Sequence, residues 1–330
     1  MTARLFEGFA RVWTPVALAR DLRDRPLGVT IAGTKVVVFR DAKGAPAALV
    51  DRCPHRGVAL SLGVVKDGCV ECPFHGWRLD RDGRVTRVPW NPDAKLDALR
   101  GAPLPARELA QQVWVYTDVT DAPPSEPEAH GALVDGSMRV SGRAVTWETH
   151  WTRAMENMLD WPHLPFVHKG TIGRGMVARA DRGRMDIAYE ERPWGARTTI
   201  TIDGEAQSGA LDFRWPNQMN LHLGSPSRPM MITVACVPID ARRTRMMLWF
   251  ARSSFKSPLF DPLFHWVNLR IANEDRAIVE SSDPAIAPEP GAERSVRTDA
   301  PTLAFRKRWR AELAESFVEP AARAALSARA

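Results

Sequence analysis

Two short segments in the first third of the chain place cysteine and histidine in closely spaced pairs. The first reads Cys-Pro-His-Arg-Gly at 53–57, and the second reads Cys-Pro-Phe-His-Gly-Trp at 72–77. Thiolates and imidazoles in such proximity are typical ligands of iron or zinc. Gly57 and Gly76 stand where a tight turn must bring backbone N–H groups near the ligand atoms, which often needs a positive φ. The pattern predicts one metal site built on two loops.

The four candidate ligands are Cys53, His55, Cys72 and His75. In a Rieske-type [2Fe-2S] centre two cysteines bind one iron and two histidines bind the other, which raises the potential relative to a cluster held by four thiolates. A structural Cys2His2 zinc site is the alternative, but zinc fingers usually pair Cys with Cys and His with His. We interpret the segments as a [2Fe-2S] site and expect the chain to transfer electrons.

A second group of candidate ligands lies near the middle of the chain, where 156–168 reads Glu-Asn-Met-Leu-Asp-Trp-Pro-His-Leu-Pro-Phe-Val-His. Two histidines and a carboxylate around a metal with open positions form the facial triad of non-heme Fe(II) oxygenases. On a straight helix His163 and His168 would point about 140° apart. Pro162 and Pro165 interrupt such a helix, so the segment can turn and bring both imidazoles together.

The third ligand of this second site is expected on a late helix, over about Leu259–Ser282. Asp275 falls within the apolar stripe of that helix, where a bare carboxylate would cost several kcal/mol to bury unless it is paired or metal-bound. Its neighbour Glu274, with an arginine one turn back, is expected on a side accessible to water. We name Asp275 as the ligand, and Asp283 and Glu280 remain the alternatives. The stripe consists of Phe264, Val267, Ile271, Ile278 and Ser282.

Together these motifs resemble the oxygenase α subunit of the Rieske non-heme iron oxygenases over nearly the whole chain. The second segment matches that family's Asn-x-x-Asp-x-x-His-x4-His motif. The resemblance implies that His163 and His168 bind a mononuclear Fe(II). It also implies that Asp160 is a bridging carboxylate between the two metal centres. In the family's typical ring of three subunits, this carboxylate hydrogen-bonds His163 and reaches His75 of the partner subunit. A carboxylate between two imidazoles would fix their tautomers and give a short path for an electron.

The cluster segments depart from those of the Rieske electron carriers of respiratory complexes. Where those proteins have two further cysteines and a cluster-bonding serine, this chain has Val58, Phe74 and Trp77. With fewer hydrogen-bond donors directed at the cluster, its reduction potential is expected toward the low end of the Rieske range. A low reduction potential suits the delivery of electrons to oxygen chemistry. A Rieske electron-transfer protein whose second domain only binds a partner is the alternative from another functional class.

Composition limits the cellular setting and the partners. The 330 residues contain four cysteines, and Cys69 and Cys236 are too few for a disulfide framework, which fits a reducing compartment. No segment approaches the apolar length of a membrane span, so we expect a soluble cytoplasmic protein. The net charge of +6 comes from dispersed arginines, which gives nucleic-acid binding little support.

The source of electrons is expected to be another protein. The sequence has no Gly-x-Gly-x-x-Gly after a strand, so the chain does not take hydride from NADH itself. The resemblance implies a flavin-dependent NAD(P)H reductase, with or without a ferredoxin. Basic residues crowd the cluster segments and would steer an acidic redox partner toward them. They are Arg52, Arg56, Lys66, Arg78 and Arg81.

The order of elements predicts an α+β architecture. Short apolar runs with turn signals at 28–50 and 113–116 predict a small antiparallel all-β Rieske domain over 1–120. The acidic, Pro-rich stretch that follows predicts a linker over 121–137. Antiparallel strands between 185 and 252 and then helices predict a catalytic domain over 138–330. The resemblance implies a helix-grip fold for it. A last helix places four apolar residues at period four: Phe305, Trp309, Leu313 and Phe317.

The substrate is expected to be a small aromatic or alicyclic compound. Met155, Leu159, Phe166 and the helix before Asp275 are expected to face an apolar pocket. The compact length resembles α-only family members that act as monooxygenases, including O- and N-demethylases. A ring cis-dihydroxylating dioxygenase is the alternative within the family.

Overall fold

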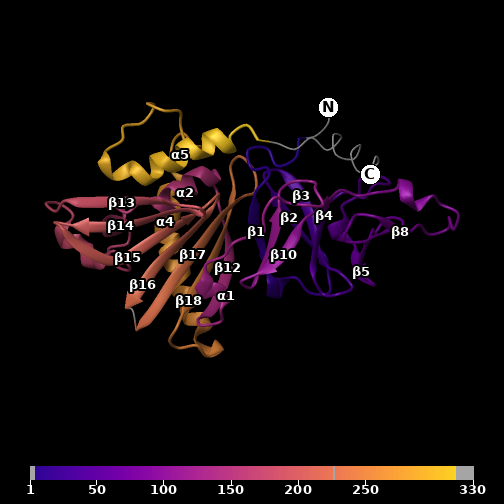
Figure 1. Cartoon of the computed structure of the whole chain (residues 1–330), viewed down its shortest axis with the longest axis horizontal. Coiled ribbons are helices and arrows are strands. Elements are labelled where there is room, and N and C mark those ends of the chain that lie inside the picture. Colours follow the sequence, from indigo (N-terminus) through magenta and orange to yellow (C-terminus); the bar gives the residue numbers. More distant parts are fainter. Residues whose placement is uncertain (1–3, 226, 317–330) are drawn as a thin grey trace. The chain divides into compact units, whose positions relative to one another are not determined.

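The structure, a computed structural model, describes residues 4–225 and 227–316. The chain divides into two compact units (Figure 1). Among the described residues, the first comprises 4–128 together with 312–316, and the second spans 129–311. No helix within the described residues is long and apolar enough to cross a lipid bilayer.

The first unit is built from three small antiparallel sheets. One has the order β1 (Trp13–Leu18), β11 (Gln112–Tyr116), β10 (Ala106–Leu109). The next has the order β2 (Leu27–Ile31), β3 (Thr34–Arg40), β4 (Pro46–Val50), β9 (Pro103–Leu104). The third has the order β5 (Val64–Lys66), β6 (Cys69–Glu71), β7 (Arg78–Leu79), β8 (Val85–Arg87). Short 3-10 turns lie at Ala19–Asp21, Leu60–Leu62 and Leu96–Ala98. The strands predicted within 28–50 and at 113–116 are confirmed.

The core of the first unit explains why these strands form. The centre of β3 is a run of three valines and a phenylalanine, all fully buried, and β-branched residues fit a strand that is covered on both faces. Phe39 and Leu49 belong to the same hydrophobic cluster as Cys53 and Cys72. The two loops that carry the candidate cluster ligands are therefore anchored in this core.

The second unit is a seven-stranded antiparallel sheet with helices against it. The strand order is β12 (Arg139–Trp147), β18 (Thr244–Arg252), β17 (Arg228–Pro238), β16 (Gln218–Ser225), β15 (Glu205–Arg214), β14 (Gly195–Ile202), β13 (Met185–Arg192). The helices are α1 (Gly131–Val134), α2 (Trp151–Leu159), α3 (Leu164–Val167), α4 (Asp261–Glu280) and α5 (Ala300–Glu312). 3-10 turns lie at Arg174–Arg179, Pro258–Phe260 and Arg297–Asp299. The predicted order of strands followed by helices is confirmed.

Helices α2 and α5 are joined by aromatic packing and by buried charges. Trp151 packs edge-to-face against Phe305 and Trp309, with ring centroids 5.7 and 6.5 Å apart. The predicted stripe on the last helix is confirmed for Phe305, Trp309 and Leu313, which are all buried, whereas Phe317 lies outside the described residues. These contacts fix α2, whose C-terminal end leads directly into the second candidate site.

Four side chains close a ring of alternating charge between the same helices. Arg153 pairs with Glu156 at 2.9 Å and with Glu293 at 2.7 Å. Arg306 pairs with the same two carboxylates at 2.6 and 2.8 Å. Because every charge in the ring has two partners, these largely buried groups meet the requirement for ion pairs away from water. The ring ties α2 to α5.

The start of α4 is held by two arginines of different exposure. Arg252 is fully buried on β18 and reaches Asp261 at 2.6 Å, and it also donates to the carbonyl of Phe255. Arg139 on β12 pairs with the other oxygen of Asp261 at 2.6 Å, but its side chain is 36% exposed. Asp261 is the first residue of the helix that carries Asp275, so these pairs set where that helix begins.

We expect Arg252→Ala to lower the free energy of unfolding by about 3 kcal/mol, because the carbonyls of Phe255 and Ser257 lose their donor and Asp261 keeps only its partly exposed partner. Arg139→Ala removes the partly exposed pair to the same carboxylate and should cost less than about 1 kcal/mol. Urea unfolding followed by tryptophan fluorescence measures both. Equal losses in the two variants would contradict the role assigned to the buried arginine.

Candidate metal centres

The two loops of the first candidate site have the same backbone construction. The N–H of Cys53 donates to the carbonyl of Val58, and the N–H of Cys72 donates to the carbonyl of Trp77, both at 2.8 Å. In each loop the glycine N–H donates back to the cysteine carbonyl, at 2.9 Å for Gly57 and 3.0 Å for Gly76. These glycines have φ of +71° and +68°, which confirms the predicted need for a positive φ.

The ligand atoms of these loops differ in their surroundings. Cys53 and Cys72 are both 2% exposed, whereas His55 and His75 lie at the surface with ring centroids 4.7 Å apart. Trp77 stacks flat on His55, with centroids 4.6 Å apart and planes inclined by 2°. Sequence reasoning noted Trp77 only as the replacement of a serine, and the structure gives it a role in orienting one imidazole.

Buried thiols beside exposed imidazoles fit a [2Fe-2S] cluster of the Rieske type. Burial and the neighbouring thiol of Cys72 raise the pKa of Cys53 to about 11. The Cys53 thiol therefore stays protonated without metal, and cluster binding must displace its proton. Thiolates inside and histidines outside would place one iron in the core and the other near the surface, where a redox partner can approach.

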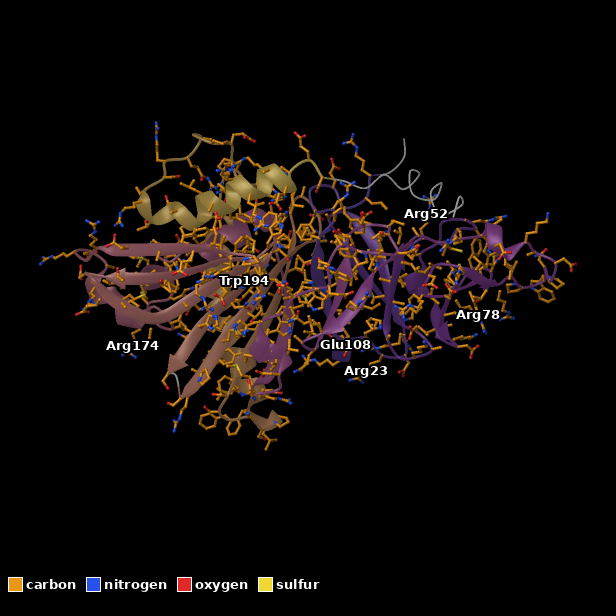
Figure 2. The ribbon with its side chains drawn as sticks, viewed as in Figure 1. Arg23, Arg52, Arg78, Glu108, Arg174 and Trp194 are labelled. Atoms are coloured by element: carbon orange, nitrogen blue, oxygen red, sulfur yellow. The ribbon has the colours of Figure 1, made fainter. Side chains whose placement is uncertain are left out.

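Most of the basic residues predicted to form a docking face are already paired. Arg78 bonds Glu71 and Asp67, both at 2.8 Å, and Lys66 bonds Glu71 at 2.7 Å. Arg81 pairs with Asp41 at 2.5 Å. Among the five, Arg52 and Arg56 have no ion pair with the described residues; Figure 2 labels Arg52 and Arg78 in the first unit. The unpaired positive charge near the cluster is therefore smaller than the sequence predicts.

The second candidate site forms where α2 ends and the chain turns. Asp160 caps the C-terminus of α2 in an extended conformation, so the helix does not continue through the motif. His163 and His168 then flank the short helix α3 as its N-cap and C-cap. Their ring centroids lie 5.1 Å apart. The predicted convergence of the two histidines through a proline-interrupted segment is confirmed.

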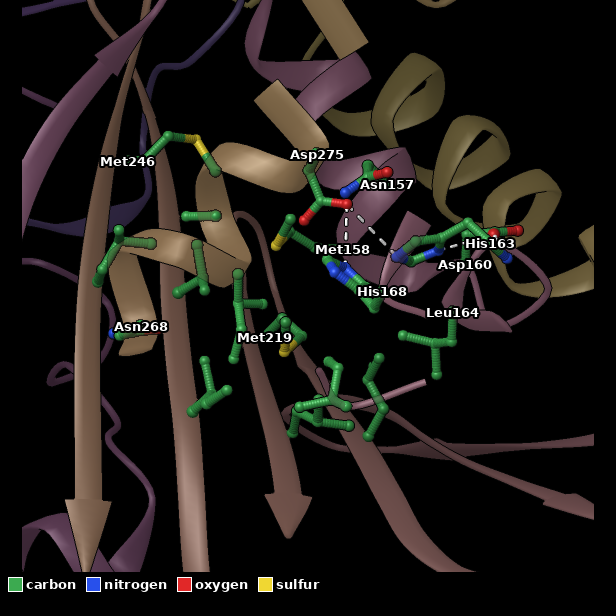
Figure 3. A pocket seen from close by; sticks show the side chains of 18 of the residues that line it. Asn157, Met158, Asp160, His163, Leu164, His168, Met219, Met246, Asn268 and Asp275 are labelled. Atoms are coloured by element: carbon green, nitrogen blue, oxygen red, sulfur yellow. Dashed lines mark hydrogen bonds and ion pairs between the residues drawn. The ribbon is translucent and has the colours of Figure 1, made fainter. Parts of the chain in front are cut away.

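Each histidine of this site is oriented by its own carboxylate. Asp160 Oδ2 lies 2.9 Å from His163 Nδ1 and also accepts from the backbone N–H of His163 at 2.9 Å. Glu274 Oε2 lies 2.8 Å from His168 Nδ1. Because Nδ1 is engaged in both rings, Nε2 is the atom left to bind a metal. The two Nε2 atoms approach Asp275 Oδ1 at 3.6 and 3.1 Å (Figure 3).

The donor set fits a divalent metal. His163, His168 and Asp275 bring one ligand atom each within 4.8 Å of one another. Burial opposes protonation of His168, but Asp275 and Glu274 outweigh it and raise the pKa of the imidazole. Asp275 is 3% exposed and its Oδ1 makes no hydrogen bond of good geometry with the described residues. A buried anionic oxygen beside two imidazole nitrogens is the environment that a cation would satisfy.

Other acidic residues considered for this site lie elsewhere. Glu280 pairs with Arg276 at 2.8 Å and accepts from the backbone of Glu148, and Asp283 is exposed. Glu274 is only partly accessible, with 21% of its side chain exposed. The prediction that it lies on the side open to water missed its contact with His168. The signal available in the sequence was the analogous need of the second histidine for a carboxylate partner.

An almost wholly apolar cavity adjoins this site, with about 550 Å³ of space not occupied by atoms, part of which is open to solvent (Figure 3). Met158 and Leu164 line it, together with side chains of the sheet and of α4. Met155, Leu159 and Phe166, which were expected to face it, do not: the first two are buried elsewhere, and Phe166 is 62% exposed. Helical periodicity alone does not reveal which buried face meets the cavity.

A further histidine–aspartate group, formed by His130, Asp212 and His222, has the composition of a metal site but not its chemistry. Asp212 is already paired with Arg197 through both oxygens, at 2.7 and 2.9 Å. His222 Nε2 lies 2.9 Å from the same carboxylate, and His130 Nδ1 accepts from the N–H of Ala132, which leaves the proton on its Nε2. This group is a hydrogen-bonded polar cluster.

Comparison with known proteins agrees with the geometry of both sites. Residues 12–103 match the family described as Rieske [2Fe-2S] domain. Residues 147–315, about half of the chain, match the vanillate O-demethylase oxygenase C-terminal domain. The chain belongs to the Rieske non-heme iron oxygenases. It is an O2-dependent oxidoreductase whose cofactors are a Rieske [2Fe-2S] cluster and a mononuclear iron, and the predicted fold class and cofactors are confirmed.

Individual relatives extend this match. Methylxanthine N3-demethylase NdmB of Pseudomonas putida is 29% identical over 89% of this chain and 84% of its own length. A tert-butanol monooxygenase / tert-amyl alcohol desaturase oxygenase subunit of Aquincola tertiaricarbonis is 31% identical over 57% of this chain, and the alignment spans 40% of that relative. The solved structure of Pseudomonas putida CBB5 NdmA aligns with TM-score 0.78 and 25% identity, covering 91% of this chain and 89% of that one.

Gly173 offers a test of how the second site is held. Its N–H donates to the carbonyl of His168, and a Cβ at this position would lie 1.8 Å from the carbonyl oxygen of Leu164. We expect Gly173→Ala to displace the segment between the two histidines and to reduce mononuclear iron toward zero while acid-labile sulfide is unchanged. Gly175→Ala is the matched control, since a Cβ there meets nothing within 4 Å. Equal iron content in both variants would contradict this account.

Glu274 offers a second test, because it orients His168. We expect Glu274→Ala to weaken Fe(II) affinity by about 10- to 100-fold, as is typical when a carboxylate behind a histidine ligand is lost. Glu274→Gln keeps an acceptor for the hydrogen bond from Nδ1–H. Its Fe(II) affinity should therefore lie between that of Glu274→Ala and that of the wild type. Competition with a chelator measures the affinity. Glu280→Ala, on the same helix, is the control, and an equal loss there would count against a specific role.

Proposed function

We propose that the chain is the terminal oxygenase component of a multicomponent system that hydroxylates or demethylates a small aromatic or alicyclic substrate, as a monooxygenase. Electrons come from a flavin-dependent NAD(P)H reductase, with or without a ferredoxin. The observation that carries the proposal is the convergence of His163, His168 and Asp275 beside an apolar cavity. The relatives support the reaction type, since one is named a demethylase and another a monooxygenase.

In this proposal Cys53, His55, Cys72 and His75 hold the cluster, and His163, His168 and Asp275 hold the mononuclear iron. When bound, these groups supply single electrons and activate O2 for insertion of oxygen into the substrate. Asp160 and Glu274 each accept a hydrogen bond from the Nδ1–H of one histidine and keep its Nε2 directed inward. The apolar walls keep water away and position the substrate.

We propose a homotrimer in which Asp160 meets His75 of the partner subunit. Asp160 lines both the cavity and a second, open hollow, so one carboxylate borders the inside and the outside of its unit. His75 lies at the surface of its unit, where another subunit could contact it. We also propose a Rieske domain over 1–120, a linker over 121–137 and a catalytic domain over 138–330. We propose a cytoplasmic location for the protein.

The bridging role of Asp160 gives the decisive experiment. Asp160→Asn retains an acceptor for His163, so we expect about three irons and two acid-labile sulfides per chain in both the variant and the wild type. Multi-turnover oxygenation with a surrogate reductase should be nearly abolished in the variant. Asp283→Asn, an exposed change, is the control. Retained turnover in Asp160→Asn would contradict the bridge, and only two irons in the wild type would indicate an electron carrier instead.

A further inference from the structure

The walls of the cavity beside the candidate iron site carry almost no polar group. Strands of the sheet contribute aliphatic and methionine side chains, and α4 contributes Ile271 and Ala272. The strand residues are Leu211, Met219, Leu221, Ile232, Val234, Met246 and Leu248. Such walls bind a substrate mainly by removing its apolar surface from water.

The charged groups that border this cavity are nearly all acidic. Within the part of the chain that the structure describes, no lysine or arginine lines it. Asp160 and Asp275 line it, and Glu274 lies directly behind His168. These three carboxylates carry one more negative charge than an Fe(II) ion carries positive charge. A substrate carboxylate would therefore enter an apolar space without a counter-charge, which is strongly unfavourable.

One polar side chain, that of Asn268, lies among the apolar walls away from the iron end. Asn268 is 4% exposed, and none of the hydrogen bonds among the described residues involves its side chain. A buried donor without a partner costs free energy that a ligand acceptor could recover. Asn268 lines the cavity.

The position of Asn268 relative to the iron end follows from helical geometry. Asn268, Ile271, Ala272 and Asp275 all line the cavity, and their spacing places them on one face of α4. Asn268 is seven residues before Asp275, which is about 10 Å along the helix axis. Figure 3 shows Asn268 at the opposite side of the cavity from His163. A small ring compound can span that distance.

We propose that this cavity takes an uncharged substrate whose hydrogen-bond acceptor is held by Asn268, while the carbon to be oxidised lies at the Asp275 end. The inference rests on the proposed oxygenase function and deepens it by naming the substrate class. Asn268 is then a specificity-determining residue. It selects compounds with a carbonyl, ether or ring nitrogen remote from the oxidised carbon, and the cavity rejects their carboxylate analogues.

The test compares uncharged and anionic compounds of the same shape. The panel pairs 4-methoxybenzamide with 4-methoxybenzoate and adds the corresponding pairs on naphthalene and cyclohexane skeletons. Binding to the holoenzyme is measured by anaerobic calorimetry, and products are identified by mass after turnover with a surrogate reductase. We expect at least one amide to bind about 100-fold more tightly than its carboxylate, because the buried anion lacks a partner. A carboxylate that binds as tightly as its amide, or no binding by any amide, overturns the inference.

A variant assigns the recognition to Asn268. We expect Asn268→Leu, which is similar in volume, to weaken amide binding by about tenfold and to give products oxidised at more than one position. Leu263→Ile, on α4 but exposed and outside the cavity, is the control and should leave both unchanged. Unchanged amide affinity and product position in Asn268→Leu overturns the assignment.

The two proposals fail in different ways. Efficient oxygenation of the carboxylates would overturn the neutral-substrate inference and leave the oxygenase function intact. Tight binding of amides with the expected dependence on Asn268, but without oxygenated product from an enzyme with full iron and sulfide content, would overturn the oxygenase function and leave the binding inference intact.

Discussion

The candidate iron site depends on two hydrogen bonds between carboxylate and imidazole. Asp160 engages Nδ1 of His163 and Glu274 engages Nδ1 of His168, so both rings present Nε2 toward Asp275. If either carboxylate were lost, the ring could rotate or change tautomer, and the ligand atoms would no longer meet. The surrounding fold can be understood as the means of holding these carboxylates and rings together.

Each element at the site has a separate anchor. Helix α2, which ends at Asp160, is fixed to α5 by aromatic contacts and by the ring of Arg153, Glu156, Arg306 and Glu293. Helix α4, which carries Asp275, is fixed at its start by the buried pair of Arg252 and Asp261. The sheet supplies the apolar wall opposite these helices. Rigid anchoring of this kind favours a preorganised metal site.

Sequence reasoning succeeded where the chemistry is local. The spacing of cysteine and histidine in 53–57 and 72–77 predicted the Rieske [2Fe-2S] cofactor, and the proline-interrupted segment predicted convergence of His163 and His168. Helical periodicity singled out Asp275, because a carboxylate in an apolar stripe needs a partner. It failed for Glu274, whose contact with His168 joins residues far apart in the chain and leaves no periodic signal.

The sequence by itself determined the cofactors, the order of strands and helices, and the family, because these follow from residue identity and short-range spacing. Tertiary structure decided which faces line the cavity: the helix before Asp275 faces it as predicted, whereas Met155, Leu159 and Phe166 do not. It also neutralised Lys66, Arg78 and Arg81 through ion pairs. Such outcomes depend on the packing of distant strands and helices, which no local pattern encodes.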